Sequence, residues 1–141
     1  MPKVSVLTPI YRPDEKLLRA TIESVLQQTF RDFEFLLLDD CPEDSREAVV
    51  RSYDDKRIVY LKNDRNLGIT ASRNRLIDLA KGEYLAIFDH DDVCLPERLA
   101  CEVAYLDAHP ECGVVSGWTK PTCGGVNEYP EDDHGIKLAM M

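Results

Sequence analysis

The stretch Tyr84–Asp92, which reads Tyr-Leu-Ala-Ile-Phe-Asp-His-Asp-Asp, passes from an apolar run directly into a run of acids. A short apolar run of this kind is typical of a strand buried in a sheet, and the acids mark the point where that strand ends. The whole chain has 141 residues. This length is enough for one domain with a sizeable core.

Other apolar runs alternate with helical patterns on both sides of this stretch. We expect strands at Val4–Thr8, Glu34–Asp39, Arg57–Lys62, Tyr84–Asp89 and Gly113–Trp118. Between them, helical spacing gathers apolar residues into three stripes: Leu17, Leu18, Ile22, Val25 and Leu26; Ile69, Leu76 and Ala80; Leu99, Val103 and Leu106. The alternation predicts an α/β, Rossmann-like fold with a mainly parallel sheet and helices on both faces.

Local signals mark the ends of the expected helices. Asp44-Ser45 can cap the second helix, Lys81-Gly82 can stop the third, and Pro96 can open the fourth. We expect residues 1–118 to form the α/β core. After Trp118 the pattern degrades, and a helix-like segment, Gly135–Met141, has no stop signal. We therefore expect residues 119–141 to be the start of an incomplete further region.

Composition excludes several classes of protein. Seventeen basic and 26 acidic side chains leave a net charge of −9, which argues against nucleic-acid binding. No apolar run approaches the roughly 20 residues of a transmembrane helix, and the N-terminus has no signal-peptide layout. These features favour a cytoplasmic location and leave peripheral membrane attachment open. The five cysteines have no disulfide or zinc spacing, so we expect reduced structural thiols.

Three expected strands end in residues capable of chemistry. The first runs into Thr8-Pro9-Ile10-Tyr11, the second into Asp39-Asp40, and the fourth into Asp89-His90-Asp91-Asp92. Ligands of open parallel sheets bind beyond the carboxyl ends of the strands. We therefore expect these residues to share one edge of the sheet and to line a ligand site.

The acids after the fourth strand predict a metal or phosphate site. In an extended chain Asp89 and Asp91 project together, and two carboxylates about 6 Å apart repel by roughly 3 kcal/mol at an effective dielectric constant near 20. Asp92 adds to the repulsion. A divalent cation relieves it, and an all-oxygen ligand set favours Mg²⁺ or Mn²⁺. Alternatively, the acids cap the loop or face water. His90 is either a ligand or, as we prefer, a solvent-facing loop residue.

Each of the other candidate site residues has a structural explanation as well as a ligand-binding one. Asp39 can accept a hydrogen bond from a base or a ribose, or it can form an Asx turn into Cys41. Gly68 permits close backbone approach at a helix start where a phosphate can bind. Arg73, further along that helix, is either placed to reach a diphosphate or solvated.

Together, these residues resemble the family 2 glycosyltransferases, the inverting enzymes of the GT-A fold. The matching pieces, in family order and spacing, are Val4–Tyr11, Ser24–Phe30, Phe33–Asp40, Asn66–Gly68, Ser72–Asn74, Lys81–Tyr84, Phe88–Asp92 and Leu95–Leu99. They cover nearly the whole chain. The resemblance implies that residues 1–118 are the nucleotide-sugar-binding core, and that residues 119–141 begin the acceptor side.

The resemblance also implies a role for each candidate residue. The predicted donor-binding set is Thr8, Pro9, Tyr11, Asp39, Asp40, Gly68, Arg73, Asp89 and His90, and the predicted metal set is Asp89, Asp91 and Asp92. In the family, Asp89 and Asp91 match the Asp-x-Asp motif that binds the ribose and the metal bridging the diphosphate. Asp39 hints at a uracil base, so a UDP-sugar is favoured as the donor.

The implied reaction is metal-assisted transfer of the sugar to an acceptor hydroxyl with inversion. Mn²⁺ or Mg²⁺ stabilises the departing nucleoside diphosphate, and a general base takes the hydroxyl proton. No catalytic base is recognised in the chain, so we expect it beyond Met141. The acids Glu128, Glu131, Asp132 and Asp133 match no base motif. The acceptor, whether carbohydrate, lipid-linked or protein, is not identified.

Three other functions were weighed. The first is a non-catalytic nucleotide-sugar-binding fragment that lacks the base. The second is a haloacid-dehalogenase-type phosphohydrolase, with Asp89 as nucleophile and Asp91 as acid and base, although that motif normally opens its domain. The third is a signalling receiver domain, whose acidic pair follows the first strand, where this chain has Thr8-Pro9.

Overall fold

The computed structural model describes residues 1–117 and 120–121. Its elements, in chain order, are β1 (Val4–Ile10), α1 (Glu15–Leu26), β2 (Phe33–Asp39), the 3₁₀ helix η1 (Pro42–Asp44), α2 (Glu47–Arg51), β3 (Ile58–Lys62), α3 (Ile69–Leu79), β4 (Tyr84–Ile87) and α4 (Arg98–Ala108). The chain divides into two compact units, Met1–Glu97 and Arg98–Met141. The sheet lies in the first unit. The predicted division at residue 118 separates a donor-binding part from an acceptor-side part rather than two compact units, and it stays a prediction.

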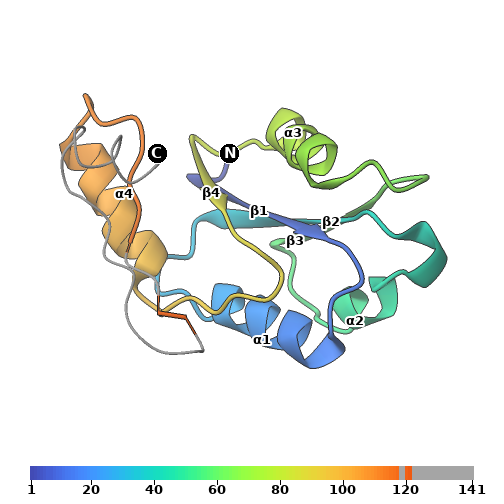
Figure 1. Cartoon of the computed structure of the whole chain (residues 1–141). Helices are drawn as coiled ribbons and strands as arrows, with labels where there is room; N and C mark the ends of the chain where they lie inside the picture. Colours follow the sequence, from blue (N-terminus) through green and yellow to red (C-terminus); the bar gives the residue numbers. More distant parts are fainter. Residues whose placement is uncertain (118–119, 122–141) are drawn as a thin grey trace. The chain divides into compact units, whose positions relative to one another are not determined.

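The four strands form one parallel sheet in the order β3-β2-β1-β4. Helices α1 and α2 lie on one face of this sheet and α3 lies on the other (Figure 1). The predicted α/β, Rossmann-like arrangement is therefore confirmed. Because every strand runs the same way, the carboxyl ends of β1, β2 and β4 meet at one edge. The expectation of a shared edge is confirmed as well.

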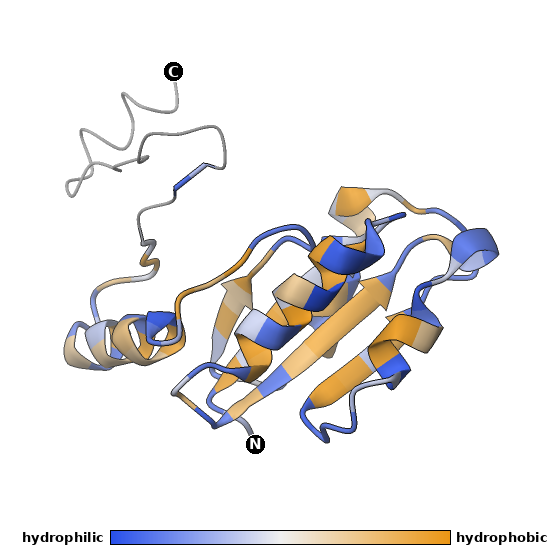
Figure 2. Cartoon of the chain, turned by 90° about the horizontal axis from the view of Figure 1, so that it is seen from below, coloured by the Kyte–Doolittle hydropathy of each residue, from blue (hydrophilic) through white to orange (hydrophobic). Residues whose placement is uncertain are grey.

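The core is built from the leucines of the central strands. Leu7, Leu36, Leu38 and Leu76 form one buried cluster, against which Leu61 and Ala80 pack. The strands are largely apolar along their length (Figure 2). The central strands β1 and β2 are buried on both faces, whereas β3 and β4 at the sides of the sheet are partly exposed. Two residues of the predicted stripes do not join the core. Leu17 is 49% exposed, and Ile69 is 56% exposed.

The predicted fourth strand is too long and the predicted fifth strand is wrong. β4 ends at Ile87, and only the Phe88 amide continues the ladder, donating to the Leu7 carbonyl at 3.1 Å. Residues 113–117 form no strand. Val114 is 83% exposed, and the described ranges offer it no ladder partner. An apolar run forms a strand only when the backbone of an adjacent strand is available to pair with it. Trp118 lies outside the described residues.

Close packing explains Gly82 better than a helix stop does. α3 ends at Leu79, before Lys81-Gly82. A Cβ atom on Gly82 would lie 2.6 Å from the Val4 carbonyl carbon and 2.8 Å from Ser5 Oγ. The Ser5 hydroxyl in turn accepts a hydrogen bond from the Gly82 amide at 2.8 Å. Gly82 therefore allows the start of β4 to lie directly against β1.

The start of α2, the cysteines and residues 119–141 compare with the sequence predictions as follows. The expected cap at Asp44-Ser45 is wrong: the N-cap of α2 is Arg46, which makes no side-chain cap bond. Ser45, one residue earlier, accepts from the Glu47 amide at 3.1 Å, and Asp44 pairs with Arg46. Cys41, Cys94, Cys101 and Cys112 are free thiols, as predicted, and Cys123 lies outside the described residues. So does the 119–141 segment, apart from Lys120 and Pro121. Within the described ranges no helix has the length and apolar character to cross a membrane.

Candidate functional site

The carboxyl edge of the sheet brings the predicted site residues together. Ile10 at the end of β1 lies opposite Asp39 at the end of β2, and Leu7 lies opposite Ile87 of β4. The loop after β4 closes onto β1, where His90 Nδ1 lies 3.3 Å from the Pro9 carbonyl oxygen. His90 is half-buried. The expectation that it simply faces solvent is therefore wrong.

Asp39 is a buried structural carboxylate at this edge. It is fully buried, and its oxygens accept from the Cys41 amide at 3.0 Å, the Arg46 amide at 2.7 Å and the Tyr60 hydroxyl at 2.9 Å. The first contact is the Asx turn that the sequence left open. Burial raises the pKa of Tyr60 above its ordinary value, and Asp39 raises it further. Contact of Asp39 with a base stays a prediction.

Asp40 occupies the position predicted for a phosphate. It is 3% exposed and accepts from Asn63 Nδ2 at 2.6 Å and from the Leu67 and Gly68 amides, both at 2.8 Å. These amides belong to the N-cap Gly68 and the residue before it, so the Asp40 carboxylate fixes the loop that leads into α3. Gly68 has a φ of 82°, with open space where a Cβ would sit. The backbone conformation, rather than close approach, requires this glycine.

Arg73 and Asp89 join α3 to the end of β4. Arg73 Nη2 donates to Asp89 Oδ1 at 2.6 Å, and the two side chains are 38% and 48% exposed. Arg73 is therefore partly exposed and ion-paired, and it lies at the carboxyl edge where the site was predicted. Its Nε is buried and has no partner among the described residues. This atom gives the site an unused hydrogen-bond donor.

Asp91 and Asp92 lie in a turn rather than in an extended strand. The Asp92 amide donates to the Asp89 carbonyl at 3.4 Å, so the alternation argument for Asp89 and Asp91 was wrong. Both Asp91 and Asp92 are exposed. The Asp91 carboxylate makes no hydrogen bond or ion pair with any residue that the structure describes. It is available to a ligand.

The acids fit a hard divalent cation that shares its coordination shell with substrate. Across residues 1–117 and 120–121, no group of three or more His, Cys, Asp or Glu side chains is arranged as a metal cage. Mg²⁺ commonly uses one or two carboxylates and completes its shell with water and substrate phosphates. Exposed Asp91, beside partly exposed Asp89, is a donor set of this kind.

The β1 end contributes one unsatisfied hydroxyl and one exposed ring. Thr8 is fully buried, and its Oγ1 has no hydrogen-bond partner in the described part of the chain. Tyr11 is 46% exposed, with the Arg12 guanidinium 5.5 Å from its ring centroid. Arg12 has a φ of 44°, a costly conformation held by its bonds to Cys41 and Glu43. Sequence reasoning missed Arg12, for which no pattern gives a signal.

Sequence reasoning also missed the polar residues of α1. Thr21, Ser24 and Gln28 are buried and contact residues 90–95. Thr21 and Ser24, three residues apart, lie on one face of α1, and Gln28 follows just after the helix ends at Leu26. This polar face was a usable signal, since Ser24 and Gln28 belong to a piece that carried the family resemblance.

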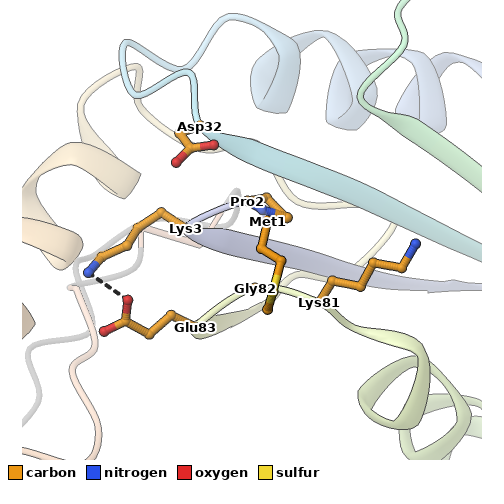
Figure 3. Close-up of a pocket in the computed structure, with 7 residues that line it drawn as sticks. All are labelled: Met1, Pro2, Lys3, Asp32, Lys81, Gly82 and Glu83. Carbon is orange, nitrogen blue, oxygen red and sulfur yellow. Dashed lines mark hydrogen bonds and ion pairs between the residues drawn. The ribbon is translucent and has the colours of Figure 1, made fainter.

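A separate open pocket lies at the opposite edge of the sheet. It has a volume of about 440 Å³ and is lined by Met1, Pro2, Lys3, Asp32, Lys81, Gly82 and Glu83 (Figure 3). Lys3 and Glu83 pair across it at 2.8 Å. These residues precede β1, β2 and β4, so the pocket is remote from the acids at the carboxyl edge.

Known proteins place the chain in a family. The sequence model described as glycosyl transferase family 2 matches residues 5–139, and the chain belongs to that family. It is 40% identical over 120 residues to the uncharacterised glycosyltransferase MJ1057 of Methanocaldococcus jannaschii, covering 83% of this chain and 41% of that protein. It is 29% identical over 107 residues to the UDP-Glc:alpha-D-GlcNAc-diphosphoundecaprenol beta-1,3-glucosyltransferase WfaP of Escherichia coli, covering 76% of this chain and 42% of that one.

A solved structure agrees with the assignment. The crystal structure of S. aureus TarS 1–349 in complex with UDP-GlcNAc superposes with a TM-score of 0.71 at 30% identity, over 77% of this chain and 32% of that one. The fold is the GT-A fold that the resemblance implied. Family membership decides against the phosphohydrolase and the receiver domain. The chain spans about four tenths of the length of the two relatives named above.

Proposed function

We propose that the carboxyl edge of this sheet binds a nucleotide-diphosphate sugar together with Mn²⁺ or Mg²⁺. The observation that carries the proposal is the turn after β4, where Asp91 is exposed and has no protein partner in the described residues. A free carboxylate beside the Arg73–Asp89 pair suits a cation that is shared with a diphosphate. A UDP-sugar is the favoured donor, because the WfaP name specifies UDP-Glc and the TarS structure contains UDP-GlcNAc.

Each part of the edge has a proposed role. Thr8, Pro9 and Tyr11 form the nucleotide side, where the exposed ring of Tyr11 is the surface offered to the ligand and the buried Thr8 supports it from within β1. Asp39 and Asp40 hold the surrounding backbone, and Gly68 holds the start of α3. Arg73 and His90 lie beside the acids and complete the donor set. Asp91 is the main metal ligand, and Asp89 and Asp92 support it.

The protein of which this fold is the donor-binding part is proposed to transfer the sugar to an acceptor hydroxyl with inversion. A bound cation supplies charge stabilisation for the leaving diphosphate. Arg73 adds a second positive charge on the same side. The general base and the acceptor are not assigned to any described residue, so donor binding without transfer is the alternative for this chain alone. A cytoplasmic location, with peripheral membrane attachment left open, also stays a prediction.

The test of the proposed function is calorimetric titration of the chain with UDP in the presence of Mn²⁺ and in the presence of a chelator. We expect binding that depends on the metal. Asp91→Asn should weaken it at least tenfold, since it removes the charge of the main ligand while keeping the shape of the side chain. Asp54→Asn is the matched control, because Asp54 is exposed and precedes β3, at the other edge of the sheet. Metal-independent binding that Asp91→Asn leaves unchanged contradicts the proposal.

A further inference from the structure

The turn that carries Asp91 is joined to α1 by hydrogen bonds. Thr21 is fully buried in α1, and its hydroxyl lies 2.9 Å from the His90 carbonyl oxygen and 2.8 Å from the Asp92 carbonyl oxygen. These two carbonyls belong to the residues on either side of Asp91. The hydroxyl has one proton, which these two carbonyl acceptors share, so one side chain from a remote part of the sequence restrains both flanks of the proposed metal ligand.

Ser24 on the same face of α1, and Gln28 just beyond the end of that helix, hold the chain that follows the turn. The Cys94 amide donates to Ser24 Oγ at 3.2 Å, and Gln28 Nε2 donates to the Leu95 carbonyl at 2.7 Å. Ser24 is 8% exposed and Gln28 is fully buried. A polar stripe buried in an otherwise apolar helix face costs desolvation energy unless each group is paired. Here the partners are mainly backbone groups of residues 90–95.

The backbone on either side of Asp91 is hydrogen-bonded, whereas the Asp91 side chain is not, within residues 1–117 and 120–121. This difference suggests a function for the buried polar residues of α1. The Asp91 carboxylate has no partner among the described residues, so nothing at the side-chain level orients it. Its position is set by its backbone, and Thr21 sets that backbone. Metal ligands must be held close to their productive geometry before the ion binds. The Thr21 contacts provide this without occupying the carboxylate.

We propose that Thr21 is a positioning residue for donor binding, which acts through the 90–92 backbone on Asp91. Ser24 and Gln28 extend the support to residue 95. The proposal rests on the proposed function, because it assumes that Asp91 meets a metal-bound diphosphate. Thr21 itself touches neither the donor nor the metal, so its effect is on the geometry of the loop alone.

The test compares Thr21→Val with Thr21→Ser in two measurements. Valine keeps the shape but removes the hydroxyl, and serine restores the hydroxyl. In hydrogen–deuterium exchange without ligand, valine should speed exchange in peptides covering residues 89–95, while β1 and β2 stay protected. In titration with UDP and Mn²⁺, valine should weaken binding about fivefold to tenfold, the effect of one buried hydrogen bond. Serine should return both values to within about twofold of the unmodified chain.

Thr29→Val is the matched control. Thr29 lies just beyond α1, and its hydroxyl also donates to a carbonyl of this segment, that of Pro96, at 3.2 Å from an exposed position. Loss of the Thr29 hydroxyl should leave the hydrogen–deuterium exchange of residues 89–92 and the affinity for UDP unchanged. If Thr21→Val unfolds the chain, Thr21→Ala removes the same hydroxyl with less steric change and takes its place in both measurements.

The possible outcomes separate this proposal from the proposed function. If the unmodified chain does not bind UDP with Mn²⁺, the proposed function fails and the positioning role fails with it. If the unmodified chain binds and folded Thr21→Val binds equally well, only the positioning role is overturned. Faster loop exchange with unchanged affinity overturns it too, because loop order then has no consequence for the donor.

Discussion

At the scale of single residues, the acids of this sheet edge differ in what satisfies them. Asp39 and Asp40 are buried and accept hydrogen bonds from backbone amides and from Tyr60 or Asn63. Asp91 is exposed and has no such partner in the described ranges. The carboxylates of this edge thus divide into buried, hydrogen-bonded groups and one exposed group that is the proposed metal ligand. Their burial, not their residue type, makes the distinction.

Tyr60 predicts a pH dependence of stability. Burial, with Asp39 as its acceptor, raises the pKa of this phenol above its unfolded value of about 10. The folded state therefore keeps its proton when the unfolded state loses it, and the stabilisation present below pH 10 declines as the pH rises. Tyr60→Phe should flatten this decline. Because the ring is only partly buried, we expect the difference to be under about 1 kcal/mol per pH unit.

The measurement is urea unfolding of both chains between neutral pH and about pH 11, in steps that bracket the titration of an ordinary tyrosine. The control is Tyr105→Phe, since Tyr105 is 47% exposed and lies in α4. If the free energy of unfolding falls equally with pH in the unmodified chain and in Tyr60→Phe, the raised pKa of Tyr60 does not contribute to stability.

At the scale of elements, the junction between β1 and β4 places the acid turn. The two strands pair from Val4 opposite Tyr84 to Leu7 opposite Ile87. At its start the pairing depends on Gly82, where there is no room for a side chain. At its end it delivers Asp89–Asp92 to the edge of the sheet. The pairing of these strands therefore links a glycine at one end to the proposed metal site at the other.

Gly82→Ala should destabilise the fold by about 2 to 4 kcal/mol, because the added Cβ meets backbone atoms of β1 that must move. Thermal and urea unfolding measure the effect. Gly113→Ala and Gly117→Ala are matched controls, since a Cβ at either position meets nothing within 4 Å. A loss for Gly82→Ala no larger than for these controls would mean that β4 does not lie this close to β1.

At the scale of the whole molecule, the net charge of −9 opposes the binding of an anionic nucleotide. A cation at the acids offsets this repulsion locally. With a chelator present, we therefore expect affinity for UDP to fall further as the ionic strength is lowered, because the repulsion is then less screened. Titration across a salt series measures this. Tighter metal-free binding at low salt would instead indicate that local positive charge, such as Arg73, governs the approach of the ligand.

The sequence by itself determined the class of fold and the location of the site. Continuous apolar runs such as Leu36–Leu38 require burial on both faces, and their alternation with helical patterns indicates a parallel sheet between helices. Residues after those runs must then lie at one edge. Apolar pattern was insufficient at Gly113–Trp118, because strand pairing depends on a neighbour that local sequence does not specify.

Only the tertiary structure decided which contacts each predicted site residue makes. The partners of Asp40 lie 23 to 28 positions away along the chain, and those of Thr21 lie 69 and 71 positions away. Such contacts follow from the packing of whole elements, which local spacing cannot encode. The same reason explains why Asp89 is found paired with Arg73 while Asp91 is left for a ligand. The pattern of acids predicted where the proposed site lies, and the packing around it decided which of its carboxylates are paired.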